Sequence, residues 1–168
     1  ISTNTIIEIQ KVLIENNAGI RKQKGTVIKN IHTNEVIYTP PEGESLIRDK
    51  LANLEEYINI DNDNIDPLIK LAIIHYQFEA IHPFYDGNGR TGRIINILYL
   101  ILKDLIDSPI LYLSKYIIEN KNEYYDLLQK VRTQGLWYEW ILYIVRGVFE
   151  TSKDSLYRLK RINEEYNN

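Results

Sequence analysis

Apolar residues recur every three or four positions along most of the chain, which is the spacing of one buried face of an α-helix. This spacing predicts helices over residues 4–15, 44–58, 66–82, 94–105, 114–120, 121–132 and 136–160. Asp66 and Pro67 support the third helix, because aspartate can cap a helix N-terminus and proline suits the first turn. The segment 94–105 is apolar on nearly every side, so we expect it at the centre of a helical bundle.

One part of the chain lacks the helical spacing. Residues 25–41, GTVIKNIHTNEVIYTPP, contain two β-prone runs at 26–31 and 35–38, with turn-forming residues between them. An isolated hairpin is not stable in water, so this one must rest on helices. No linker or second domain is visible. The predicted fold class is therefore all-α, with a single domain over residues 1–168 and one β-hairpin.

Composition excludes several classes of protein. With 168 residues, 44% of them hydrophobic and 26% charged, the chain has the make-up of a globular domain and not of a disordered one. A net charge of −3 gives no general attraction to nucleic acid or to anionic membranes, and the longest apolar run is too short to span a bilayer. The absence of cysteine excludes disulfides and thiolate metal sites and suits a reducing, cytoplasmic location. The opening ISTNTIIEIQ has neither an initiator methionine nor a signal sequence, so we expect a trimmed sequence.

The densest chemistry lies in HPFYDGNGRTGR, residues 82–93. Its three glycines permit positive φ and close backbone approach, so successive N–H groups can surround an anion. The helix that follows adds free N–H donors and the positive end of its dipole. Arg90 and Arg93 lie three residues apart on one side of that helix and can hold phosphate oxygens. These features predict a polyphosphate site. It is neither a Walker A loop nor a dinucleotide fingerprint, because the preceding element is helical.

Two further residues of the motif predict a reaction at this site. A carboxylate beside bound phosphates repels them unless a hard cation lies between, so Asp86 implies Mg²⁺. His82 is the nearby side chain that can accept a proton near neutral pH. Together they suggest phosphoryl or nucleotidyl transfer to a hydroxyl, with His82 as the base.

Plainer interpretations exist for each group taken alone. A Gly/Asn-rich loop is often only a turn, arginines near a helix start are often solvated, and a histidine before proline is often structural. All of these groups at this spacing, followed by an apolar helix, favour the site. We interpret Phe84 as a core residue beneath the loop, His75 as a packed helix residue and His32 as a turn residue.

The motif resembles the Fic-domain signature H-P-F-x-[D/E]-G-N-G-R-x-x-R, and it matches every fixed position. NNAGIRKQKG and VIYTPPEG resemble the arginine-containing segment and the flap hairpin that precede a Fic core. LAIIHYQFEAIHPF resembles the helix that leads into the motif, and NKNEYYDLL resembles a later nucleotide-pocket helix. The resemblance thus extends over almost the whole chain and implies a Fic-type helical bundle with one hairpin flap.

This resemblance implies an adenylyltransferase that moves AMP from ATP to a Ser, Thr or Tyr hydroxyl of a target protein, or of itself, and releases pyrophosphate. It makes His82 the catalytic base and Asp86 the Mg²⁺ ligand, and it places Arg93 at the terminal phosphate. The α- and β-phosphates would be bound by neighbouring motif residues, namely Gly87, Asn88, Gly89 and Arg90. Thr91 and Gly92 complete the implied ATP-binding set.

The resemblance also implies roles outside the motif. Tyr124 and Tyr125 would help to form the nucleoside pocket, although adjacent tyrosines on a helix more often serve packing. The flap residues Val36, Ile37 and Tyr38 would cover the nucleotide and align the target as an added strand.

One departure from the family concerns regulation. Many Fic proteins carry an inhibitory [S/T]-x-x-x-E-[G/N] helix, but Lys11 and Lys115 stand where Ser or Thr would precede Glu15 and Glu119. An inhibitory segment would then lie upstream, come from a partner such as an antitoxin, or not exist. A domain of this size with exposed aromatic residues can also form a homodimer.

Two other functions compete with AMP transfer. One is a different reaction on the same scaffold, either removal of AMP from a modified protein or kinase-like phosphoryl transfer. Gly89 argues against the kinase-like reaction, since kinase-like relatives carry lysine in place of a motif glycine. The other is a nucleotide-sensing interaction module with little turnover, which would not need His82 and Asp86 intact.

Overall fold

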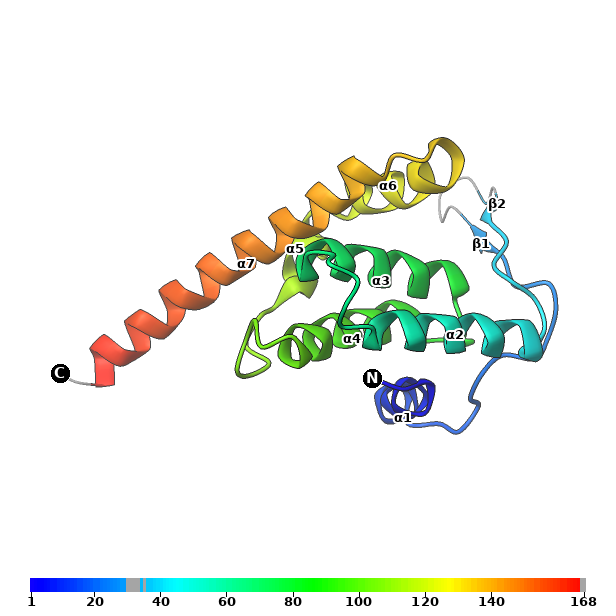
Figure 1. Ribbon diagram of the computed structural model, residues 1–168, viewed down its shortest axis with the longest axis horizontal. Helices are drawn as coiled ribbons and strands as arrows, with labels where there is room; N and C mark the ends of the chain where they lie inside the picture. Colours follow the sequence, from blue (N-terminus) through cyan, green and yellow to red (C-terminus); the bar gives the residue numbers. More distant parts are fainter. Residues whose placement is uncertain (30–33, 35, 167–168) are drawn as a thin grey trace.

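The computed structural model describes residues 1–29, 34 and 36–166. The described residues form seven helices and one small antiparallel sheet, arranged as Figure 1 shows. Their order is α1 (Thr3–Ile14), β1 (Ile28–Lys29), β2 (Val36–Tyr38), α2 (Glu44–Asn59), α3 (Pro67–Ile81), α4 (Asn88–Leu102), α5 (Leu113–Glu119), α6 (Lys121–Gln134) and α7 (Trp137–Tyr166). All seven predicted helices and the hairpin are present, which confirms the predicted fold class.

Local sequence signals account for several helix ends. The Asp66 side chain accepts a hydrogen bond from the Leu68 N–H at 2.8 Å, and Pro67 is the first residue of α3, as predicted. Gly135 ends α6 in the left-handed conformation, with φ of 69°. Polar caps and a glycine stop therefore set these boundaries, and not the apolar spacing.

The helix after the motif begins earlier than predicted. We expected it from residue 94, but α4 begins at Asn88 and includes Gly89 and Gly92 in its first turns. Glycine is a poor helix former, which hid this start from the sequence pattern. The structure gives the reason for both glycines, because other side chains occupy the space where their Cβ atoms would lie.

The central helix of the bundle is α3, and not the predicted segment 94–105. In Figure 1, α3 lies between α2 and α4 on one side and α6 and α7 on the other. Its buried residues point in every direction and include the polar side chains of Lys70 and His75. In contrast, α4 packs against α3 and α1, and its end leaves Leu102 46% exposed. The apolar residues of a segment did not by themselves distinguish the central helix from a helix that has one solvent-exposed side.

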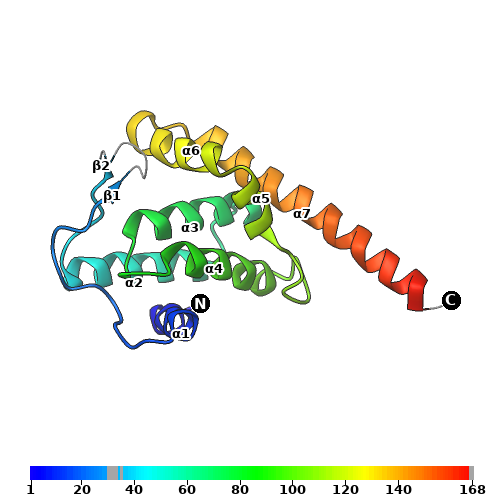
Figure 2. The same ribbon diagram turned by 180° about the vertical axis from the view of Figure 1, so that it is seen from behind.

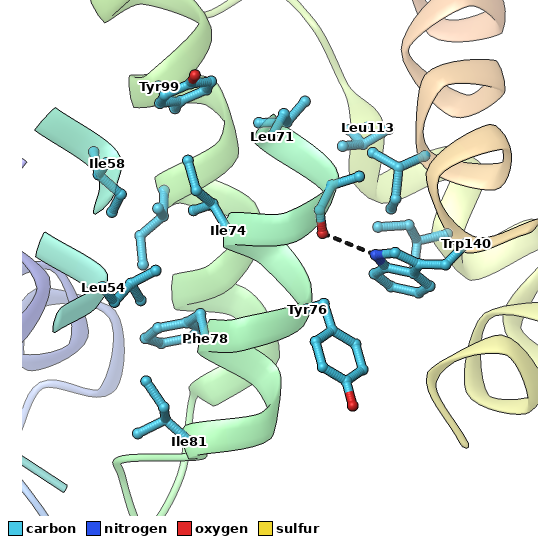
Figure 3. Close-up of a cluster of buried hydrophobic side chains, with 14 of the residues drawn as sticks. Leu54, Ile58, Leu71, Ile74, Tyr76, Phe78, Ile81, Tyr99, Leu113 and Trp140 are labelled. Carbon is cyan, nitrogen blue, oxygen red and sulfur yellow. Dashed lines mark hydrogen bonds between the residues drawn. The ribbon is translucent and has the colours of Figure 1, made fainter. Parts of the chain in front are cut away.

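Figure 3 shows how α7 joins the core through Trp140. The indole N–H donates to the Ala72 carbonyl of α3 at 2.8 Å, and the ring is fully buried. It stacks on His75, with ring centroids 6.0 Å apart and planes 2° apart. Burial lowers the pKa of His75 to about 3, so this ring is neutral. His75 is thus a packed core residue, as predicted.

The hairpin is shorter than predicted among the described residues. Ile28 pairs with Tyr38 and Lys29 with Val36, with an irregularity between the two pairs. Of the predicted turn, His32 and Thr33 lie outside the described residues. Strands of two and three residues cannot persist alone, and the contacts of Tyr38 with the helices, given below, help to stabilise this sheet.

Two helices mark the edges of the molecule. Figures 1 and 2 show α1 lying across α2 and α4, and α7 continuing well beyond the bundle. The far half of α7 exposes a row of apolar side chains, among them Leu156, Leu159 and Ile162. No helix in the described part of the chain is long and apolar enough to cross a membrane.

Candidate active site

His82 lies at the turn that ends α3. Its backbone is left-handed, with φ of 47° and ψ of 60°, a conformation that residues other than glycine rarely adopt. The segment that follows α1 contacts this turn and holds it in place. Ile20 forms a β-bridge with Phe84, and the Arg21 N–H donates to the Pro83 carbonyl at 2.9 Å. The position of the histidine is therefore set by tertiary contacts and not by helix geometry alone.

Asn88 closes the loop between α3 and α4. Its side-chain oxygen accepts from the Phe84 N–H at 2.9 Å, and its amide nitrogen donates to the Phe84 carbonyl at 2.8 Å. Asn88 is 4% exposed and Phe84 is fully buried, which confirms Phe84 as the core anchor of the loop. Because the Asn88 amide is engaged in this way, only its backbone N–H remains for a phosphate.

The N-terminus of α4 offers free backbone donors. Gly87 caps the helix in the left-handed conformation, with φ of 84°, and no side chain caps it. The first intrahelical bond comes from the Thr91 N–H, so the N–H groups of the three preceding residues have no helical partner. These residues line a cavity of about 220 Å³ together with His82, Tyr85 and Asp86. A helix N-terminus of this kind attracts anions.

Gly87 is required for a second reason. A Cβ at this position would lie 2.8 Å from the Ile14 side chain, so α1 packs directly against the loop. The Gln10 amide of α1 also donates to the Asp86 carbonyl at 3.2 Å. Helix α1 thus packs against the loop that contains Asp86 and Gly87.

Asp86 is the acidic residue of this cavity. One carboxylate oxygen accepts from the Gly87 N–H at 2.6 Å, and the other faces Arg90 at 3.4 Å. The Asp86 side chain is 71% exposed, so this ion pair is weak and can open. Among the described residues, no three His, Asp or Glu side chains converge as a metal cage. One accessible carboxylate fits Mg²⁺, which commonly takes one or two carboxylates and completes its shell with phosphates and water.

The electrostatics of His82 suit a proton acceptor. Burial, and to a lesser extent the nearby Arg21 charge, lower its pKa to about 4, and a hydrogen bond to the Glu79 backbone acts in the opposite direction. The imidazole is therefore neutral at physiological pH and can accept a proton.

Two motif residues face away from the cavity. Thr91 is fully buried, and a Cβ on Gly92 would lie 2.8 Å from Glu79 Oε1 and 3.0 Å from the Phe78 ring. Both positions pack against α3. We therefore correct their expected ATP contact to a supporting role behind the phosphate site.

Glu79 is a residue that the sequence analysis missed. Its Oε1 is buried without a hydrogen-bond partner among the described residues, close to Gly92 and to the guanidinium of Arg93. Burial raises its pKa to about 7, against the opposing effect of the Arg93 charge. The available signal was a lone carboxylate within the apolar run LAIIHYQFEAI.

The flap hairpin is attached through Tyr38. The Tyr38 hydroxyl donates to the Ala80 carbonyl at 2.7 Å, and the Arg132 guanidinium lies 3.4 Å from the ring centroid. Val36 is 55% exposed and Ile37 is partly buried. Tyr38 therefore fixes the base of the hairpin, and Val36 is the most exposed of the three residues of β2.

The two tyrosines of α6 have different environments. Tyr124 is 4% exposed, and its hydroxyl is 2.9 Å from His75 Nε2 within the aromatic cluster around Trp140. Tyr125 is 50% exposed. Packing explains Tyr124, which corrects its expected place in the pocket wall, whereas half of the Tyr125 side chain stays accessible.

Comparison with known proteins matches residues 1–100 to the Fic/DOC family. The chain belongs to this family. The matched region of this Fic domain includes the flap and the whole motif, whereas the α6 tyrosines lie outside it.

Relatives and solved structures agree with this assignment. The chain is 27% identical over 170 residues to protein adenylyltransferase fic-1 of Caenorhabditis elegans, covering 93% of this chain and 31% of the relative. It is 30% identical to the Caenorhabditis briggsae protein of the same name over 74% of this chain and 23% of that protein. The chain thus spans under a third of these relatives.

Two solved structures share the fold of this Fic domain. Fic-1 from C. elegans superposes with a TM-score of 0.70 at 24% identity, over 96% of this chain and 44% of that chain. A Fic family protein from Desulfovibrio desulfuricans G20 has a TM-score of 0.70 at 23% identity, over 91% and 46% of the two chains.

Glu79→Gln should stabilise the Fic domain in a pH-dependent way. A raised native pKa means that the folded protein binds more protons than the unfolded chain between about pH 4.5 and 7, so stability falls as pH rises through that window. Glutamine cannot ionise. The variant should gain up to about 3 kcal/mol at pH 8, or about 5–10 °C in Tm, and under about 1 kcal/mol at pH 5.

Thermal denaturation at the two pH values measures this difference. Glu119→Gln, at an exposed glutamate on α5, is the matched control and should give the same small shift at both. An equal shift for Glu79→Gln at pH 5 and pH 8 would contradict a buried ionisable carboxyl.

Proposed function

We propose that residues 1–168 form one catalytic domain that transfers AMP from ATP to a Ser, Thr or Tyr hydroxyl of a target protein and releases pyrophosphate. The observation that carries the proposal is the neutral His82 imidazole beside the uncapped N-terminus of α4. A proton acceptor and an anion site within one cavity are what nucleotidyl transfer to a hydroxyl requires. The names of the two Caenorhabditis relatives support the same activity.

His82 would accept the hydroxyl proton as the hydroxyl oxygen attacks the α-phosphorus. The new oxygen–phosphorus bond forms while the bond from the α-phosphorus to the bridging oxygen breaks, and the electron pair leaves with pyrophosphate. The free N–H groups of Asn88, Gly89 and Arg90, together with the Arg90 side chain, would stabilise the negative charge on the phosphates. Asp86 would hold Mg²⁺, which supplies charge neutralisation on the phosphates when bound.

The remaining residues would select and orient the substrates. Tyr125 would lie against the nucleoside from α6, and the exposed edge at Val36 would pair with the target as an added strand. Tyr38 would act indirectly, by fixing the flap to α3 and α6.

A regulatory partner has room beside the arginines. A groove of about 530 Å³ runs along α4 and α5, lined by Arg90, Arg93 and apolar side chains such as Leu13, Ile97 and Tyr112. An inhibitory segment, from the same polypeptide or from an antitoxin-like partner, would reach the terminal-phosphate position from this groove. We place the reaction in the cytoplasm, where ATP and Mg²⁺ are available.

Parallel incubation with α-labelled and γ-labelled ATP tests the proposed reaction. AMP transfer puts only the α-label on protein, and kinase-like transfer puts only the γ-label there. A nucleotide sensor labels nothing. Removal of AMP is tested separately, by loss of α-label from a pre-modified protein. Intact mass after Mg-ATP exposure would show self-modification as one or more AMP units.

Arg93→Ala should weaken ATP binding and leave ADP binding nearly unchanged. Only ATP presents a terminal phosphate to this guanidinium, and loss of one charge-assisted bond typically costs about 1.5–3 kcal/mol. Calorimetric titration of both nucleotides into wild type and variant measures the effect.

Arg90→Ala is the matched control for this prediction. It should weaken both nucleotides, because Arg90 lines the cavity at the α- and β-phosphates. Equal weakening of ATP and ADP by Arg93→Ala would remove the terminal-phosphate role from Arg93.

A further inference from the structure

Arg21 is a fully buried arginine between α1 and the flap. Its Nε donates to the His82 carbonyl at 2.7 Å, and its Nη2 donates to the Ile81 carbonyl at 3.4 Å and to the Pro41 carbonyl. Its backbone N–H donates to the Pro83 carbonyl at 2.9 Å. One residue therefore bonds to the end of α3, to the histidine and to the residue that leaves the flap.

The segment around Arg21 strengthens this connection. Ile20 bridges to Phe84, and the Lys22 N–H donates to the Tyr85 hydroxyl at 2.9 Å. Three consecutive residues after α1 thus follow the loop from Pro83 to Tyr85.

Burying a guanidinium only to bond carbonyl groups costs free energy, because the charge loses its contact with water. No ion pair of Arg21 occurs among the described residues, its Nη1 has no hydrogen-bond partner there, and burial lowers its pKa. A simple helix end is capped more cheaply by a glycine or by water. The burial is explained if Arg21 holds two parts of the chain at once. One is Pro41, where the chain leaves the flap, and the other is His82, whose backbone is in the left-handed region.

We propose that Arg21 is a positioning residue, which holds His82 and the base of the flap hairpin in the arrangement needed for transfer. This inference rests on the proposed function, since it treats His82 as the base. Arg21 does not itself line the cavity, and it reaches the cavity through its hydrogen bond to the His82 carbonyl, so its effect passes through His82 and Pro41.

The charge of Arg21 provides a readout that a purely structural role would not move. Its positive charge lowers the pKa of His82, after burial as the larger cause. Among the described residues, the ionisable side chains that share the cavity of His82 are Tyr85, Asp86 and Arg90. Glu42, Tyr38 and Tyr85 act on Arg21 itself. Removal of the Arg21 charge should therefore let His82 protonate at higher pH.

The test compares Arg21→Met, Arg21→Lys and the control Lys22→Met. Arg21→Met should lower kcat by about 10²-fold, since a misplacement of about 1 Å has that effect, while KM for ATP stays within about threefold. The His82 pKa, followed by NMR of its ring signals, should rise toward the ordinary value of histidine. The acidic limb of the kcat profile should move upward with it. Lys22→Met removes an exposed charge next to Arg21 and should change none of these.

Arg21→Lys separates charge from geometry. A lysine keeps the positive charge but cannot reach three carbonyls, so the His82 pKa should stay low while kcat falls by about tenfold or more. If Arg21→Met does not fold, the lysine variant carries the test. Wild-type kcat in Arg21→Lys, or an unchanged His82 pKa in a folded Arg21→Met, would overturn the proposal. If the wild type transfers no AMP while the His82 pKa responds as expected, the proposed function fails and the physical contact between Arg21 and His82 stands.

Discussion

His82→Ala is expected to lower the rate of AMP transfer by about 10²–10⁴-fold, the usual effect of losing a general base. ATP binding should change by less than about threefold, because the imidazole acts on the incoming hydroxyl and not on the nucleotide. Transfer of α-labelled AMP measures the first quantity and calorimetric titration of ATP the second. Wild-type turnover in the alanine variant would remove the base role from His82.

The backbone at His82 calls for a second variant. Its φ of 47° is in the left-handed region, which alanine tolerates poorly and asparagine tolerates well. His82→Asn keeps this conformation and removes the base. If both variants lose transfer and His82→Asn retains the wild-type Tm, the loss is chemical. Recovery of transfer in His82→Asn alone would mean that the alanine effect came from backbone strain.

The fold was largely predictable because the apolar spacing of helices and their capping residues can be recognised in the sequence. Asp66, Pro67 and Gly135 are local signals, and the structure uses each as expected. The failure at α4 has the same origin, since glycine normally argues against helix. Positions 89 and 92 of this helix are glycine because Arg93, Glu79 and Phe78 fill the space where a Cβ atom would lie, and tertiary crowding of this kind leaves no mark in local propensity.

The site was predictable where a short motif contains it. His82, Asp86 and Arg90 do line one cavity. Which of the α6 tyrosines is buried and which is exposed could not be read from their adjacent positions. Helical phase leaves Tyr124 bonded to His75 and Tyr125 in the open, and that phase depends on how α6 packs on α7.

Supporting residues were the hardest to predict. Glu79 lies three residues before His82, but its importance comes from burial next to Gly92, which no spacing rule describes. Arg21 is distant in sequence from the loop that it holds, at a separation of 61 residues from His82. Contacts at such separations follow from topology, and topology requires the assembled fold.

Asp86→Ala is expected to lower the transfer rate at saturating Mg²⁺ by about 10²-fold or more and to flatten the dependence of that rate on metal concentration. Asp86 is the acidic residue that lines the cavity, and the Glu79 carboxyl is buried beside Arg93. No other carboxylate of the cavity lining can therefore take over as the metal ligand when Asp86 is removed. Initial rates across a Mg²⁺ titration, for wild type and variant, measure both effects.

The metal role also predicts how the variant binds nucleotide without metal. In the wild type, Asp86 pairs with Arg90 and repels phosphates, so removing the carboxylate frees an arginine and removes a negative charge. Metal-free ATP should therefore bind Asp86→Ala at least as tightly as wild type, although the variant transfers poorly. Asp86→Asn is the matched variant, since it keeps an oxygen for the Gly87 N–H and removes the charge. Weaker metal-free binding in both variants would indicate damage to the phosphate site, and an unchanged metal titration would place the metal ligand elsewhere.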